Sequence, residues 1–187
     1  MAKSGQMIEN PIIGDRVIFR KTAQETNGEA LEFEMFIKPG AAGPPLHIHP
    51  NSEERFTVLE GNLDAIVDGN NWSFGKSETF CVPAGAPHTW WNSGESEARV
   101  MVQFSPASRM ETFLETLYGL AKDGKVDSNG MPGFLQLAVI SSDYFDVNHL
   151  ASPPLALQKV LFGLLRPIGL LFGYESVYPY PYKVYTN

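Results

Sequence analysis

The chain has 187 residues, of which 43% are hydrophobic and 19% are charged, and its formal net charge is −7. This length allows one domain with an elaboration, or at most two small domains, and the composition is that of an ordinary globular protein. The negative net charge disfavours a surface for binding nucleic acid, and no basic cluster contradicts this. The only cysteine, Cys81, excludes an intrachain disulfide, and we expect it to be a buried small hydrophobic residue.

The amino-terminal stretch MAKSGQMIENPIIGDRV contains no apolar run of the kind that a signal peptide needs. We therefore expect a cytoplasmic protein, the default for a chain with no such signal and no disulfide.

Short runs of β-branched and aromatic residues fill the chain up to residue 105, and turns rich in glycine, proline and asparagine separate them. Many short strands without intervening helices predict a sandwich or a closed barrel. The sequence DGNN at 68–71 predicts a hairpin turn between two of the strands. The predicted strands span 16–20, 31–38, 46–49, 54–60, 62–67, 71–74, 79–82 and 98–104, and another strand begins at His88.

The hydrophobic period becomes helical after residue 105. Ser105 and Pro106 predict a helix N-cap followed by proline at the first helical position. Ser108 and Glu111 could instead form a capping box half a turn later. We expect this first helix to end at 122–124, and we predict a second helix at 134–144.

The apolar stretch 155–174 (LALQKVLFGLLRPIGLLFGY) is interrupted by Lys159, Arg166, Pro167 and three glycines, so it is not an uninterrupted membrane span. Pro167 should kink the stretch or split it in two. We expect a pair of short helices that pack on the barrel or on a second subunit. A helix on a membrane surface is the alternative, but only two cationic residues flank its apolar face.

Two of the four histidines in the chain, His47 and His49, lie two positions apart in the segment GPPLHIHPNSEERF. The prolines around them disfavour a helix, and on a strand both imidazoles project from the same face. A tight connection leads to Glu53 and Glu54. If Phe56 and its alternate neighbours on that strand point inward, Glu54 lies on the inner face too, whereas Glu53 remains the alternative candidate.

A second loop, VPAGAPHTWWN, leads to His88 at the start of another strand. Three imidazoles and one carboxylate could therefore converge inside the barrel, where so many polar groups need a partner. This donor set suits Fe(II), Mn(II), Ni(II), Co(II) or Zn(II) and gives no reason to prefer Mg or Ca. In a six-coordinate ion, four protein ligands leave two adjacent positions for water, substrate or dioxygen. We expect the remaining histidine, His149, to lie at the surface and not to be a ligand.

These residues resemble the two signature motifs of the cupin superfamily, and the resemblance covers residues 30–105. The first motif is a Gly, then HxH, a Glu and a Gly, and it matches Gly43 (or Gly40, on a longer spacing), His47, His49, Glu54 and Gly61. The second motif is a Gly, then PxG, a His and an Asn, and it matches Gly75, Pro83, Gly85, His88 and Asn92. The gap from Gly75 to Pro83 is longer than the family pattern, which leaves the strand register before Pro83 open.

The resemblance implies a mainly β protein, a double-stranded β-helix or jelly-roll barrel, followed by carboxyl-terminal α-helices. It also implies that His47, His49, Glu54 and His88 bind the metal. We expect residues 1–105 to form the barrel domain. Residues 106–187 should form a helical extension, similar to that of some small single-barrel cupins, which packs on the barrel or on a dimer partner.

Strand alternation predicts which side chains line the pocket. On the last strand either Arg99, Met101 and Gln103 or Val100, Val102 and Phe104 face inward. The candidate lining residues are Phe33, Met35, Phe56, Val58, Trp90, Met101 and Gln103. Gln103 is the polar candidate for orienting a ligand or a metal-bound water, and a solvent-facing position is its alternative. A mostly apolar lining suits a small, flat or hydrophobic ligand better than a polyhydroxylated sugar.

We expect a metal-dependent, dioxygenase-like oxidoreductase that acts on a small molecule chelated to the metal. One alternative is an isomerase, epimerase or lyase in which the ion polarises a carbonyl, although no inward general base is evident. The other is a non-catalytic barrel that binds or senses a small molecule. Since the barrel edges and the apolar helices at 106–121 and 155–174 offer surface to bury, we also predict a homodimer.

Overall fold

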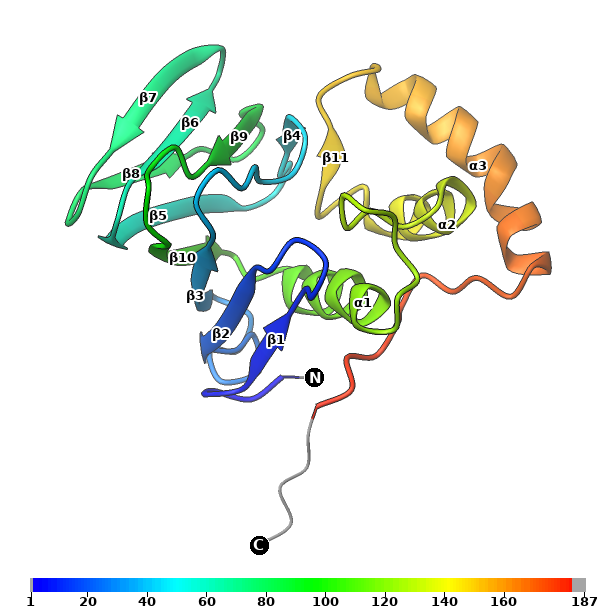
Figure 1. The fold of residues 1–187 in the computed structure, drawn as a ribbon. Coiled ribbons are helices and arrows are strands. Elements are labelled where there is room, and N and C mark those ends of the chain that lie inside the picture. Colours follow the sequence, from blue (N-terminus) through cyan, green and yellow to red (C-terminus); the bar gives the residue numbers. More distant parts are fainter. Residues whose placement is uncertain (1, 183–187) are drawn as a thin grey trace, which may run out of the picture.

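The computed structural model describes residues 2–182 and contains two antiparallel sheets, with three helices beside them (Figure 1). In spatial order, the six-stranded sheet contains β1 (Met7–Glu9), β2 (Arg16–Lys21), β3 (Leu31–Ile37), β10 (Ala98–Ser105), β5 (Glu53–Glu60) and β8 (Thr79–Val82). The five-stranded sheet contains β11 (His149–Leu150), β4 (His47–Ile48), β9 (His88–Trp91), β6 (Leu63–Val67) and β7 (Asn70–Phe74). The helices are α1 (Met110–Lys122), α2 (Phe134–Tyr144) and α3 (Leu155–Leu171). The predicted mainly β jelly-roll with carboxyl-terminal helices is therefore confirmed.

Alternating apolar residues form the strands and bury one face of each sheet. Val58 and Val102 on the six-stranded sheet belong to the same buried cluster as Leu63 and Trp90 on the five-stranded sheet. Every predicted strand is present, and its ends agree with the prediction to within one residue. The predicted turn at 68–71 is also confirmed, since Asp68 and Gly69 have φ values of 49° and 77°, as a two-residue hairpin of type I′ requires.

The inward face of β10 differs from the lining residues that we predicted. Val100, Val102 and Phe104 are fully buried, whereas Met101 and Gln103 are half-buried and lie on the opposite face. The amide of Gln103 donates to a carboxylate oxygen of Glu32 at 3.1 Å. The opposite face carries Arg99 and Gln103 beside Met101, so apolar alternation along β10 indicates the face that the structure buries. The prediction that Met101 and Gln103 line the pocket was therefore wrong.

Helix α1 begins at Met110, later than either predicted cap, and Arg109 precedes it without a side-chain cap. The hydroxyl of Ser108 hydrogen-bonds to that of Ser52 at 3.0 Å. Glu111 accepts hydrogen bonds from the backbone N–H groups of Ala2 and Ala23, each at 3.1 Å. Both cap predictions were therefore wrong, because these side chains join distant segments to the helix and do not cap it.

The stretch 155–174 contains one helix that continues through Pro167, and not the two short helices that we expected. One face of α3 packs on α2: Phe162 is in ring contact with Phe134, and Gly169 lies directly against Val139. Packing on both sides of the proline holds the helix together even though Pro167 cannot donate a backbone hydrogen bond. None of the helices formed by residues 2–182 has the length and apolar character needed to cross a membrane.

Cys81 is half-buried, whereas we expected it to be buried.

Two strands of the structure, β1 and β11, were not predicted. Strands β1 and β11 are only three and two residues long, too short for a periodic pattern to be recognised. Strand β11 follows α2 in the chain, yet it pairs with β4 at the edge of the five-stranded sheet (Figure 1). The segment after α2 therefore lies beside the strand that carries His47.

Candidate metal centre

Three segments of the barrel bring together the four predicted side chains. His47 lies on β4, with His49 just beyond its end, Glu54 lies on β5, and His88 begins β9 opposite His47 in the strand register. All four are buried, with exposed fractions of 4%, 4%, 5% and 1% for His47, His49, Glu54 and His88. One ligand atom from each residue lies within 4.8 Å of all the others. The cluster can therefore hold one cation between its members.

Glu54, and not Glu53, faces the histidines. The side chain of Glu53 is partly exposed and forms an ion pair with Arg55 at 3.0 Å. On the inner face, Glu54 Oε2 lies 2.8 Å from His88 Nε2 and 3.4 Å from His49 Nε2. Alternation along β5 therefore places Glu54 in the cluster and directs Glu53 away from it.

Backbone carbonyls fix the orientation and the tautomer of each imidazole. A carbonyl oxygen only accepts hydrogen bonds, so an Nδ1 atom in contact with one must carry the proton. In a neutral ring the Nε2 atom then holds a free lone pair, the form that a metal ion needs. The three contacts join Nδ1 of His47 to Pro45 O at 2.9 Å, Nδ1 of His88 to Ala86 O at 3.1 Å, and Nδ1 of His49 to Val147 O at 2.8 Å.

The Nε2 atoms of His47 and His49 face each other at 3.1 Å. With both Nδ1 atoms protonated, two neutral rings would direct lone pairs at each other, which is repulsive unless a proton or a cation lies between them. Two neighbouring ligands on one octahedral ion, with bonds of about 2.1 Å, lie about 3.0 Å apart. The geometry and the donor types both fit a divalent transition metal.

Charge and burial act in opposite directions on the cluster. Burial lowers the pKa of His47 to about 3, and the nearby His88 and His49 lower it further. Burial also favours the neutral form of His49, but the hydrogen bond to Glu54 outweighs burial and raises the pKa of His49 overall. Burial would raise the pKa of Glu54, yet hydrogen bonds that His49 and His88 donate in their protonated forms lower it to about 2. The site thus contains a permanent carboxylate that needs a positive partner, either a proton on an imidazole or a bound cation.

The contact between His49 and Val147 shows that the segment after α2 completes the cluster. Asn51 donates to the carbonyl of Asp146 at 2.8 Å, and the N–H of Ala151 donates to Leu46 O at 3.0 Å. The segment therefore runs antiparallel along one edge of the HxH strand, whose other edge pairs with β9. Sequence analysis missed Val147 because its contribution comes from the main chain, which leaves no signal in residue type.

The fourth histidine is separate from the cluster. His149 lies on β11, and its Nδ1 atom is in contact with the carbonyl of Leu150. It is not one of the four clustered residues, although it is half-buried and not fully at the surface as we expected.

Other residues of the two motifs shape the backbone around the site. A Cβ atom on Gly43 would lie 2.6 Å from the ring of Trp90, so only glycine allows this approach. Asn92 is fully buried and forms three hydrogen bonds, to Ile37 O, Ser96 O and the N–H of Gly94, each at 2.9 Å. These residues position the strands and contact none of the clustered donor atoms.

The predicted lining side chains outside β10 are all buried: Phe33, Met35, Phe56, Val58 and Trp90. Phe104, which we had not chosen, also approaches the cluster: its ring meets that of His49 edge-on, with centroids 5.0 Å apart. An aromatic ring therefore packs directly against one of the clustered imidazoles.

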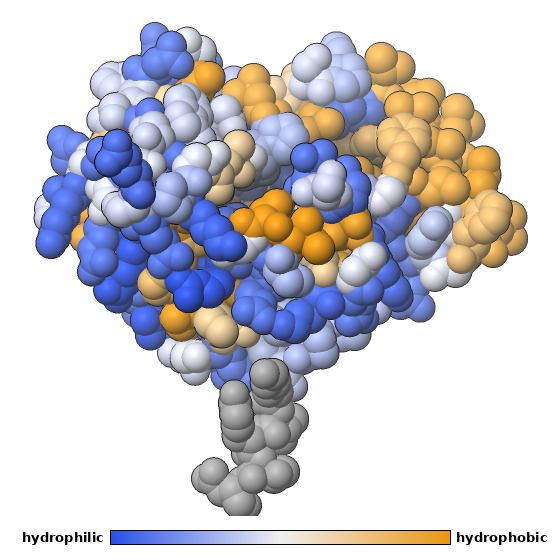
Figure 2. Space-filling model, in the orientation of Figure 1, coloured by the Kyte–Doolittle hydropathy of each residue, from blue (hydrophilic) through white to orange (hydrophobic). Residues whose placement is uncertain are grey.

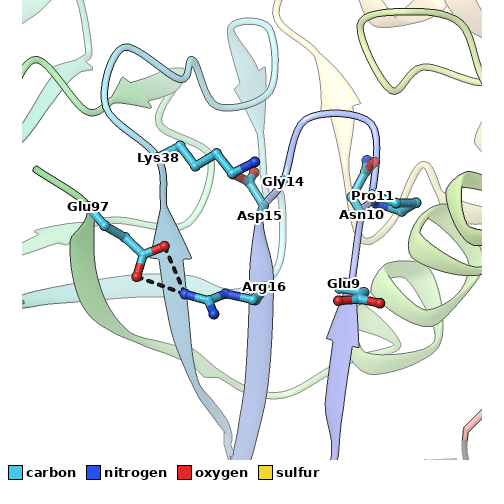
Figure 3. Close-up of a pocket in the computed structure, with 8 residues that line it drawn as sticks. All are labelled: Glu9, Asn10, Pro11, Gly14, Asp15, Arg16, Lys38 and Glu97. Atoms are coloured by element: carbon cyan, nitrogen blue, oxygen red, sulfur yellow. Dashed lines mark hydrogen bonds and ion pairs between the residues drawn. The ribbon is translucent and has the colours of Figure 1, made fainter.

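A separate polar hollow of about 330 Å³ lies beside the β1–β2 hairpin (Figure 3). Arg16 and Glu97 form an ion pair across it at 2.7 Å, and Lys38 extends toward Asp15. Asp15 is buried, its Oδ1 atom has no hydrogen-bond partner, and burial raises its pKa to about 7. This hollow shares no residue with the histidine cluster.

Known proteins similar to this chain include a cupin domain family and several oxidoreductases. The family model described as "Cupin domain" matches residues 33–104. Over 160 residues, the chain is 30% identical to a probable oxidoreductase of Hypocrea virens, covering 79% of this chain and 71% of the relative. It is 28% identical to an oxidoreductase of Pestalotiopsis fici, covering 63% of this chain and 60% of the relative. It is also 30% identical to a quercetin 2,3-dioxygenase of Bacillus subtilis, covering 41% of this chain but only 25% of that protein.

Proposed function

Because the chain belongs to the cupin superfamily, we propose that it is a metal-dependent oxidoreductase with oxygenase-type activity on a small molecule that chelates the metal. The proposed ligands are His47, His49, Glu54 and His88. One observation carries the proposal: three imidazole lone pairs and an ionised carboxylate converge in a buried site, and backbone carbonyls hold all three rings in the tautomer that ligation needs.

The donor set suits Fe(II), Mn(II), Ni(II), Co(II) or Zn(II). When bound, such an ion acts as a Lewis acid toward a chelating oxygen ligand and, if it is redox-active, supports oxygen chemistry. Four protein donors would leave two positions of a six-coordinate ion for other ligands.

The protein's own residues favour a particular kind of substrate. One carboxylate and three neutral imidazoles leave a divalent ion with a net charge of about +1, which favours an anionic or enolisable oxygen ligand. The ring of Phe104 against His49 and the buried Trp90 on the strand of His88 favour a flat molecule. We therefore infer a small planar substrate with two neighbouring oxygen atoms.

The relatives support this reaction class. Two of them are named oxidoreductases, and a third is named a quercetin 2,3-dioxygenase. We also propose that residues 1–105 supply the donor atoms, and that the extension at 106–187 orients one of them through the carbonyl of Val147.

Oxygen uptake tests the proposal. The chelator-treated protein is reloaded with each of the five metals in turn, and uptake is recorded with flavonols, catechols and aldose sugars. We expect uptake with a planar chelating compound and one metal, loss of uptake in Glu54→Gln, and retention in the matched variant Glu53→Gln. Equal turnover of the same compound under argon would exclude oxygenase chemistry, and conversion of sugars alone would overturn the inferred substrate class.

A further inference from the structure

The outward face of α3 is apolar along the whole helix, and nothing in residues 2–182 covers it. We define this face as the outer stripe, which consists of Leu157, Val160, Leu161, Leu164, Pro167, Ile168 and Leu171. Its members are strongly exposed: 55% for Leu157, 69% for Leu164 and 88% for Leu171. In Figure 2 the hydrophobic surface gathers on the side where Figure 1 places α3. A contiguous apolar surface of this kind usually marks an interface.

We propose that the outer stripe is the interface of a homodimer, in which α3 pairs antiparallel with α3 of a second copy across a two-fold axis near Leu164. This inference goes beyond the proposed activity and does not depend on it. A two-fold interface must be self-complementary, because the same patch serves both copies.

The spacing of the stripe meets that requirement. Its members lie three, four and seven positions on either side of Leu164, so they share one helix face. Rotation about an axis at Leu164 then places every apolar position opposite another: Leu157 opposite Leu171, and Val160 opposite Ile168. Leucine and isoleucine at 157, 161, 164, 168 and 171 also alternate by four and three positions, which is the pattern of a helix–helix seam.

The opposite face of α3 is already occupied. Gln158, Phe162 and Gly169 are its buried residues, and they face α2 and the segment before α3. The outer stripe is therefore a second apolar surface of α3, distinct from the face that packs in the core. A helix that is apolar on two faces needs two partners, and the chain supplies only α2 among the residues described.

The charges on α3 favour a second copy over a membrane. The outer stripe contains no charged residue, so two stripes can meet without repulsion. Lys159 and Arg166 are the two cationic residues of the helix, they lie away from the stripe, and Arg166 is paired with Asp143 at 3.1 Å. A helix that lies on a membrane usually carries many cationic residues on its polar face. The net charge of −7 also opposes binding to an anionic lipid surface.

The first test measures the mass of the full chain in solution by light scattering at tens of micromolar. We expect twice the chain mass of 20.7 kDa for the unmodified protein and the single-chain mass for Leu164→Glu. Because Leu164 is exposed, this change should not disturb folding. The control Trp72→Glu, at an exposed apolar residue on β7, should remain dimeric. A monomeric unmodified protein, including one that binds phosphatidylcholine vesicles as a monomer, would overturn the proposal, and so would a dimer that survives Leu164→Glu.

Cysteine cross-linking tests the antiparallel arrangement itself. A Cys81→Ser background removes the only native thiol. In this background, Leu164→Cys should form a disulfide-linked dimer under mild oxidation. Leu157→Cys and Leu171→Cys should cross-link poorly alone and efficiently when the two proteins are mixed. Efficient cross-linking of Leu171→Cys with itself, without cross-linking of Leu164→Cys, would contradict the two-fold axis at Leu164.

Discussion

Replacing the buried Asn92 with alanine removes three hydrogen bonds that tie the loop after β9 to the end of β3. The side-chain amide donates to Ile37 O and Ser96 O, and its oxygen accepts from the N–H of Gly94, each at 2.9 Å. Each such bond contributes about 1 kcal/mol net, and a buried group left unpaired costs about 1–3 kcal/mol. We therefore expect Asn92→Ala to lower the free energy of unfolding by about 3–5 kcal/mol, a large part of the stability of a typical domain.

Urea denaturation of the chelator-treated protein measures this change without a contribution from bound metal. With a slope of about 2 kcal/mol per molar urea, the midpoint should fall by about 1.5–2.5 M. Asn70→Ala is the matched control: it removes one exposed bond of 3.2 Å to Asp68 O and should change stability by less than about 0.5 kcal/mol. The number of metal ions bound per chain should stay the same in Asn92→Ala, since Asn92 contacts no clustered donor atom. A midpoint like that of the control would refute this reasoning.

Three further changes test the packing and the buried charge. Gly43→Ala should destabilise the fold by about 1–3 kcal/mol in urea denaturation, because its Cβ would lie 2.6 Å from the ring of Trp90; no change would show that the ring can move aside. Gly163→Ala, on α3 with open space around it, should instead stabilise by about 0.5–1 kcal/mol, and a loss of stability would mean that this position is covered. Asp15→Asn should stabilise the fold increasingly as pH rises from about 4 to about 7, measured by denaturation across that range.

The sign for Asp15 follows from its raised pKa. In the folded state the carboxyl keeps its proton up to about pH 7, whereas the unfolded chain releases it near 3.8. Between these values the folded state binds more protons, so stability falls as pH rises, by up to about 4 kcal/mol. The asparagine variant does not titrate and should lack this loss. Parallel pH profiles for the two proteins would contradict the burial of an unpaired carboxylate.

The barrel strands and the candidate donors could be predicted from the sequence because both follow from local alternation. Two histidines on one strand and Glu54 beside Phe56 need only a period of two to be placed on a common face. The same rule indicates Val100, Val102 and Phe104 as the inner face of β10, and these residues are buried. Met101 and Gln103 were wrongly predicted to line the pocket because their face, which they share with Arg99, is mostly polar.

Contacts between distant segments could not be predicted. Glu111 forms hydrogen bonds with the backbone near the amino terminus and not with its own helix end, and the carbonyl of Val147 reaches His49 across 98 positions in the chain. The continuity of α3 through Pro167 likewise depends on packing against α2. In each case the deciding partner lies outside the sequence window in which a periodic pattern can be recognised.

Metal content tests the central claim most directly. The chelator-treated protein is incubated with Mn(II), Fe(II), Co(II), Ni(II) or Zn(II), passed through a desalting column, and analysed for bound metal. We predict one ion per chain for the unmodified protein and for His149→Ala, which changes a histidine outside the cluster, and almost none for His49→Ala. Equal metal content in His49→Ala and His149→Ala, or no retained metal in the unmodified protein, would contradict the account.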